Sequence, residues 1–271
     1  MSGNGPLTLA DCRAVVREDI GELPAGLHPS RSLNDSSGGS DMWGRIVVAV
    51  PSCAATQPRL SNYLSIFEPW FEALGLAYFV VLAHPTVPAK DDYLVLPDSR
   101  VFVVRAKEGY ETLAHKLVVF YDYVLRETDY THVLKCDDGC LLNLANAASM
   151  LELDYAGTII QPTLNTIHQG RCADTSLNQV ALDLTHGLSD IARGGPGGER
   201  IELGKIDYAA GGYAYRLSRA ALHAVTRHRS RIESLTLSYE DLLFGQLCAI
   251  GGFAVSPLNL GRYHRIAGTE C

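Results

Sequence analysis

The chain has 271 residues, of which 47% are hydrophobic, 20% charged and 8% aromatic, and its 23 basic and 30 acidic residues give a formal charge of −7. This composition excludes a disordered chain, which would be less apolar and more charged, and a repetitive fibre, since no internal repeat is visible. It predicts a globular protein with a substantial core, and the lack of a basic surplus argues against a nucleic-acid partner.

The first 44 residues are predicted to be an N-terminal extension and linker. Thr8 and Asp11 have the spacing of a capping box that opens a helix to about Glu18, and residues 32–41 are almost all small or polar. We see neither a secretory signal nor an apolar run of about 20 residues that could span a bilayer. We therefore expect a cytoplasmic protein without a transmembrane segment.

Residues 45–271 are predicted to form one α/β domain. Continuous apolar runs, typical of strands buried on both faces, occur at 45–50, 77–82, 101–104 and 132–136. Apolar residues recur at helical spacing over 60–74, with a kink expected at Pro69, and over 113–125. This alternation predicts βαβ units and a mainly parallel sheet flanked by helices.

The pattern becomes less regular in the second half of the chain. It predicts a helix over 143–151, a strand over 156–160, a helix over 218–228 with Ser218 as N-cap, and a helix over 240–250 that ends at Gly251 and Gly252. The segment 161–204 is irregular, and we expect it to be a mobile lid that orders when substrate binds.

Two carboxylates, Asp137 and Asp138, directly follow the predicted strand at 132–136. Ligands of open α/β sheets bind at the carboxyl ends of strands, and adjacent carboxylates there suit a hard divalent cation that would hold a diphosphate. A simple turn would also place acidic residues at this point, so the pair alone leaves both interpretations open.

Two further pairs could carry chemistry. Glu240 and Asp241 begin a predicted helix, where they either complement the helix dipole or provide a general base with a like-charged neighbour. Gly211 and Gly212 either form a tight turn or let another group approach the backbone closely. The seven scattered cysteines are expected to be free thiols, because no second Cys or His pair lies at zinc spacing.

In their order along the chain, four segments resemble glycosyltransferase family 31, the β-1,3-galactosyltransferase and Fringe group, from about Arg45 to His264. Residues 108–116 are similar to the family's D-x-Y-x-N-L-T-x-K, 133–139 to its strand ending in a triple Asp, 211–219 to G-G-A-G-[YF]-x-L-S-R, and 240–245 to E-D-V-x-x-G.

This resemblance implies a GT-A fold and inverting transfer of a sugar, of the galactose or N-acetylhexosamine class, from a UDP-sugar to a hydroxyl of a glycan or small-molecule acceptor. It implies Asp241 as the general base, with Glu240 beside it. The implied contacts to the nucleotide sugar are Arg59, Lys116, Asp137, Asp138, Gly211 and Gly212. Eukaryotic members are anchored in the Golgi membrane, and nothing here serves as such an anchor, so the acceptor could be a bacterial polysaccharide precursor or a metabolite.

The resemblance also implies a Mn²⁺ or Mg²⁺ site at Asp138 and His264, although a lone histidine is often only a surface or core residue. The family's third Asp, the usual metal ligand, is Gly139 here. Three alternatives follow. Asp138 coordinates the metal instead; cationic side chains screen the diphosphate without a metal; or the chain is a catalytically silent sugar-nucleotide or carbohydrate-binding module. The candidate cations are Lys116, Arg262 and Arg265.

A nucleotidyltransferase on a similar sheet is a third candidate function. We rank it last, because no glycine- and lysine-rich phosphate loop follows the first predicted strand.

Overall fold

A computed structural model of the chain describes residues 43–53, 57–88, 91–109, 112–160, 206–234 and 240–263. The predicted helix over 8–18, the linker and the predicted lid over 161–204 lie outside these residues. Within them, no helix is both long enough and apolar enough to cross a bilayer.

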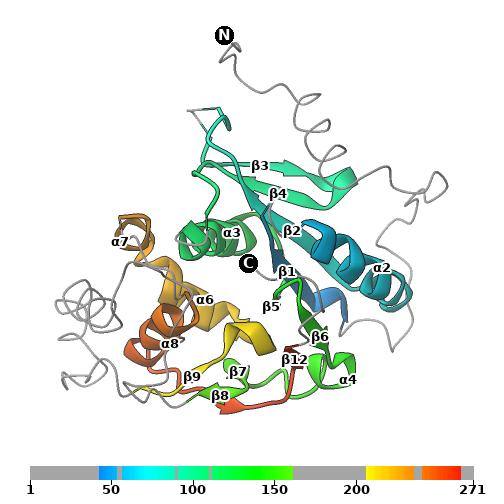
Figure 1. The fold of residues 1–271 in the computed structure, drawn as a ribbon. Coiled ribbons are helices and arrows are strands. Elements are labelled where there is room, and N and C mark those ends of the chain that lie inside the picture. The colour runs from blue at the N-terminus through cyan, green and yellow to red at the C-terminus, as the bar shows by residue number, and fades with distance from the viewer. Residues whose placement is uncertain are drawn as a thin grey trace, which may run out of the picture.

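The centre of the fold is an eight-stranded mixed sheet with the order β11-β7-β10-β5-β1-β2-β4-β3 (Figure 1). Its strands are β1 (Ile46–Pro51), β2 (Ala77–Ala83), β3 (Tyr93–Leu96), β4 (Val101–Val104), β5 (His132–Lys135), β7 (Tyr155–Gly157), β10 (Tyr215–Ser218) and β11 (Ser256–Pro257). The neighbours β4, β2, β1 and β5 run parallel, whereas β10 is antiparallel to both β5 and β7. The predicted α/β class with a mainly parallel sheet is confirmed.

Helices cover both faces of this sheet (Figure 1). One face packs against α2 (Gln57–Leu74), and the other against α3 (Leu113–Glu127), α6 (Arg219–Thr226) and α8 (Glu240–Ile250). The short helix α7 (Arg229–Glu233) packs on α3. Every residue of β1 is buried, because alternate side chains enter the two apolar clusters on either side of the sheet.

The strand order creates a switch point between β1 and β5. From β1 the chain passes through α2 to β2 on one side, and after β4 it passes through α3 to β5 on the other side of β1. In open α/β sheets the crevice outside the carboxyl ends of the strands at such a point binds ligands. The fold therefore makes the residues that follow β1 and β5 the candidates for a ligand-binding site.

Most predicted elements are found, with α8 at its predicted bounds and Ser218 as the N-cap that accepts a hydrogen bond from the Ala221 N–H. The helix predicted over 143–151 is much shorter, since α4 spans only Leu144–Ala147. It ends early because the buried Arg216 binds the carbonyl oxygens of Ala147 and Ser149, at 2.8 and 2.7 Å.

Several short strands were not predicted or are divided. The strand predicted over 156–160 is split into β7 and β8 (Ile159–Ile160), and β8 pairs with β9 (Tyr208–Ala209) in a separate ribbon. A second ribbon joins β6 (Cys140–Leu142) to β12 (Gly261–Tyr263). The edge strand β3 was also missed. Residues Trp43–Arg45, the first that the structure describes, form a short 3-10 helix, η1, at the boundary of the predicted extension.

Candidate active site

Charged side chains gather at the carboxyl-terminal edge of β1 and β5, in two groups. We call Ser52, Arg59, Glu108, Lys116 and Asp138 the Asp138 cluster. We call Lys135, Asp137, Gly211, Glu240 and Asp241 the Glu240 cluster.

The Asp138 carboxylate is almost completely buried and is held from two sides. Arg59 Nε lies 2.5 Å from its Oδ1, and Ser52 Oγ donates a hydrogen bond of 3.1 Å to its Oδ2. Arg59 lies in the first turn of α2 and Ser52 directly follows β1. The Arg59 side chain is 20% exposed, so this arginine reaches solvent while the carboxylate that it holds does not.

Lys116, on α3, holds the backbone of Ser52, the residue whose hydroxyl binds Asp138. Its Nζ donates to the Ser52 carbonyl oxygen at 2.9 Å and to Glu108 Oε1 at 2.6 Å, and its side chain is only 3% exposed. Glu108 Oε2 in turn accepts a hydrogen bond from the Ala83 N–H at the end of β2. Lys116 therefore fixes the backbone after β1, and its ammonium faces the protein instead of solvent.

In the Glu240 cluster, one buried lysine joins two acids. Lys135 Nζ lies 2.7 Å from Asp137 Oδ1 and 2.7 Å from Glu240 Oε1, and it donates to the Gly211 carbonyl oxygen at 3.3 Å. Lys135 is the last residue of β5, and Glu240 is the first residue of α8. The contact thus joins the carboxyl end of the sheet to the N-terminus of a helix.

Asp241 is held by backbone groups. Its Oδ2 accepts a hydrogen bond from the Gly211 N–H and its Oδ1 accepts one from the Leu242 N–H, both at 2.9 Å. A Cβ at position 211 would lie 2.8 Å from Glu240 Oε1 and 2.9 Å from Lys135 Nζ. Gly211 is therefore needed for the close approach of its backbone to the charged groups. Gly212 follows in the 3-10 helix η7 (Gly211–Tyr213).

Burial and neighbouring charges set the protonation of this cluster. Burial raises the pKa of Glu240 to about 7, Lys135 opposes the rise, and the nearby carboxylates Asp241 and Asp137 add to it. Burial alone would lower the pKa of Lys135, but Asp137 and Glu240 outweigh it, so this pKa is raised and the ammonium is kept. Glu240 can therefore exchange a proton near neutral pH beside Asp241.

The two carboxylates after β5 do not fit a divalent cation in this arrangement. Asp138 is already paired with Arg59, Asp137 with Lys135, and Gly139 has no side chain. In the part of the chain that the structure describes, no group of three or more His, Cys, Asp or Glu side chains could hold a metal ion. The other predicted metal ligand, His264, lies outside that part, so the Mn²⁺ or Mg²⁺ site stays a prediction.

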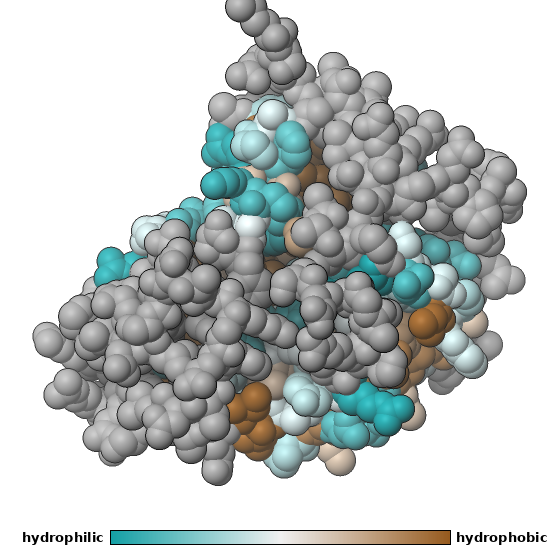
Figure 2. Space-filling model, in the orientation of Figure 1, coloured by the Kyte–Doolittle hydropathy of each residue, from teal (hydrophilic) through white to brown (hydrophobic). Residues whose placement is uncertain are grey.

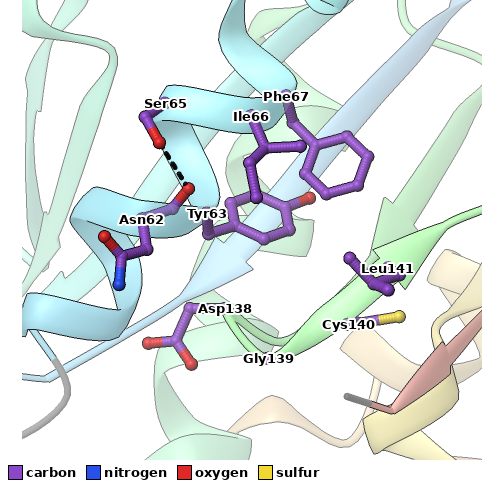
Figure 3. Close-up of a pocket in the computed structure, with 9 residues that line it drawn as sticks. All are labelled: Asn62, Tyr63, Ser65, Ile66, Phe67, Asp138, Gly139, Cys140 and Leu141. Carbon is purple, nitrogen blue, oxygen red and sulfur yellow. Dashed lines mark hydrogen bonds between the residues drawn. The ribbon is translucent and has the colours of Figure 1, made fainter. Parts of the chain in front are cut away.

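A pocket of about 300 Å³ opens beside Asp138 (Figure 3). Asn62, Tyr63, Ile66 and Phe67 of α2 lie on one side of it, and Asp138, Gly139 and β6 lie on the other. Figure 3 shows Asp138 and Asn62 at one end and Phe67 and Leu141 toward the other. The pocket thus has a polar end at the switch point of the sheet and an apolar end.

The surface beside the pocket is mixed in character. Ile66 and Trp70, one helical turn apart on α2, are 51% and 59% exposed. On the face drawn in Figure 2, the described residues are mainly hydrophilic and their apolar side chains form separate small patches.

The described cysteines are free, and burial raises the pKa of Cys140 in the pocket wall to about 12, so this thiol is neutral at physiological pH.

The structure brings most of the sequence-predicted site residues into the two clusters. Arg59 contacts Asp138 directly, and Lys116 reaches it through Ser52. Sequence reasoning did not single out Lys135, Ser52 or Glu108. Lys135 and Glu108 could have been found, because they lie within the motifs at 133–139 and 108–116. Ser52 lies in neither motif.

Neither protein-family models nor curated proteins match this chain. The resemblance to glycosyltransferase family 31 therefore depends on the order of the four sequence motifs, and the activity that it implies stays a prediction.

Proposed function

We propose that the chain is an inverting glycosyltransferase of the GT-A type, which moves a sugar from a UDP-sugar to an acceptor hydroxyl with Asp241 as general base. The observation that carries this proposal is the Glu240 cluster. It ties the acidic pair at the start of α8, through Lys135 and Gly211, to the acidic residue that follows β5.

The arrangement of the sheet supports a nucleotide-sugar substrate. A GT-A domain is Rossmann-like, and Rossmann-like sheets bind nucleotides outside the carboxyl ends of parallel strands at a switch point. The pocket beside Asp138 opens at this position, between the residues that follow β5 and the helix that follows β1. Its volume is enough for a part of a UDP-sugar, such as the nucleoside.

The chemistry of inversion needs one group that removes a proton from the acceptor. As the acceptor oxygen attacks C1 of the sugar, its proton passes to a carboxylate, and the bond from C1 to the diphosphate oxygen breaks with its electron pair. The two backbone N–H donors hold the Asp241 carboxylate in one orientation. The neighbouring Glu240 is buried and paired with Lys135. Asp241 is therefore the better candidate for direct contact with the acceptor.

A second candidate function is a sugar-nucleotide-binding module without catalysis, and Gly139 favours it because the family's usual metal ligand is missing. Such a module would bind UDP but would never release it from a UDP-sugar. The preserved pair Glu240 and Asp241, held in a specific network, favours the enzyme.

The test of this proposal is Asp241→Asn, assayed for UDP release with UDP-hexose donors and an acceptor mixture. We expect a loss of at least about 100-fold in kcat, which is typical for removal of a general base. The matched control is Asp129→Asn, an exposed carboxylate between α3 and β5. Asp241→Asn with the wild-type rate would show that Asp241 is not the base.

A further inference from the structure

Two arginines neighbour residues that line the pocket beside Asp138, one next to each wall. Arg59 lies on the same helical face as Asn62 and Ile66, three and seven residues later in α2, and both of these line the pocket. Arg59 therefore stands at the end of the pocket wall formed by α2, where its Nε meets Asp138.

The other arginine comes from the far end of the chain. Arg262 in β12 is exposed and is paired with Leu141 in β6, which lines the opposite wall of the pocket. Residues directly opposite each other in an antiparallel pair project to the same face of the sheet. The side chain of Arg262 therefore projects to the same face of the ribbon as that of Leu141, the middle residue of β6.

The charge balance at this pocket differs from that of a carboxylate site built for a metal ion. The acidic residue that lines the pocket, Asp138, has a guanidinium 2.5 Å away, and its neighbour Asp137 has an ammonium 2.7 Å away. Gly139 adds no third negative charge. A divalent cation would have to displace Arg59 from a buried carboxylate, whereas a diphosphate would meet carboxylates that are already neutralised.

We propose that this chain binds the diphosphate of its donor with the guanidinium groups of Arg59 and Arg262, without a divalent cation. This inference rests on the proposed use of a UDP-sugar. A guanidinium has five N–H donors in a planar fork, so Arg59 can keep its Nε on Asp138 and offer other donors to phosphate oxygens. When the bond from C1 to oxygen breaks, its electron pair goes to the diphosphate, and the two guanidinium groups stabilise that charge.

The experiment is calorimetric titration of UDP into the full chain, once with EDTA and once with Mn²⁺. We expect the same Kd in both buffers, within about twofold, for the wild type. Arg59→Gln and Arg262→Gln should each weaken binding in EDTA by about tenfold or more, because each removes charge-assisted hydrogen bonds to phosphate. Arg126→Gln, at the exposed C-terminal end of α3, is the matched control and should not change Kd.

Two variants add a signature that mere structural damage cannot produce. Arg59→Gln removes the guanidinium from Asp138 Oδ1, and Gly139→Asp adds a carboxylate next to Asp138. Both should make UDP binding weak in EDTA and should let Mn²⁺ restore it, because each leaves a carboxylate beside the pocket that a divalent cation can bind. Arg262→Gln leaves the carboxylates as they are, so its loss should not be restored by Mn²⁺.

The outcomes separate this inference from the proposed function. Wild-type binding that needs Mn²⁺ would overturn the inference and leave the glycosyltransferase proposal standing. Binding in EDTA that neither arginine variant weakens would show that other groups hold the diphosphate. No UDP binding in either buffer would overturn both proposals.

Discussion

The Asp138 cluster and the Glu240 cluster start from two successive residues at the end of β5, yet they differ in almost every respect. Asp138 meets a partly exposed arginine beside a pocket, whereas Asp137 meets a buried lysine that also holds Glu240. The chain turns at this point, since the Cys140 N–H donates to the Asp137 carbonyl oxygen at 2.9 Å, and helices cover both faces of the sheet. The sequence predicts one cation site at Asp137 and Asp138, but the two carboxylates lie in different environments and bind different cationic side chains.

This difference has a functional meaning under our proposals. The Asp138 cluster faces the pocket on the side of α2 and would hold the donor's nucleotide and diphosphate. The Glu240 cluster lies on the side of α8 and would activate the acceptor. The reacting C1 atom would then lie between them, near the end of β5. If the two clusters carry separate tasks, a change in one of them should spare the task of the other.

The strongest effect should come from Lys135→Met, which leaves the buried Glu240 and the partly exposed Asp137 without their counter-ion. Breaking a buried ion pair by removing one partner costs about 3–5 kcal/mol of unfolding free energy. Urea denaturation measures this cost, with Lys107→Met at an exposed position as control. The double variant Lys135→Met with Glu240→Gln should recover part of the loss, because fewer buried charges stay unpaired.

The free energy of unfolding should also depend on pH through the Glu240 cluster, because Glu240 has a raised pKa in the folded protein. Between the ordinary value of 4.5 and about 7, the folded state holds a proton that the unfolded state has lost. This stabilisation is therefore fully present below pH 4.5 and is lost as the pH rises to about 7, by up to about 3 kcal/mol.

The measurement is urea denaturation over this pH range for the wild type, Glu240→Gln and the exposed control Glu127→Gln. Only Glu240→Gln should flatten the dependence. An unchanged pH dependence in that variant would mean that Glu240 is not the group that titrates.

A smaller effect is expected from Gly211→Ala. The added methyl group would lie 2.8 Å from Glu240 Oε1, so the buried acid or Lys135 must shift. Overpacking of this kind costs about 1–3 kcal/mol, and displacement of the Asp241 carboxylate should lower kcat. Gly44→Ala is the matched control, since nothing lies within 4 Å of its Cβ position. UDP binding should survive in both variants, because the Asp138 cluster is untouched, and a joint loss of kcat and UDP binding in Gly211→Ala would argue against separate tasks.

The sequence was most informative where both faces of an element are buried. The apolar run at β1 and the helical stripe of α3 follow directly from such burial, and both were found close to their predicted bounds. The strand β3 has four residues at the edge of the sheet, where only one is fully buried, so it carries no comparable signal. The ribbon of β6 and β12 also escaped prediction, because its two strands are only three residues long and come from distant parts of the chain.

The candidate site was predictable in its residues but not in its pairings. Asp137, Asp138, Glu240 and Asp241 stood out because acidic pairs sit at the end of a strand and the start of a helix. Which cation meets which acid depends on how α2, α3 and α8 pack on the sheet. That packing puts Lys135 between Asp137 and Glu240 and puts Arg59 on Asp138, which the local sequence does not encode.

The most direct test of the central claim is to incubate the wild-type chain with UDP-hexoses and a mixture of acceptors and to measure both UDP and new glycoside. Our account predicts UDP release together with a glycoside whose anomeric configuration is opposite to that of the donor. UDP that binds in titration but is never released from any UDP-sugar would contradict the account and would identify the chain as a binding module.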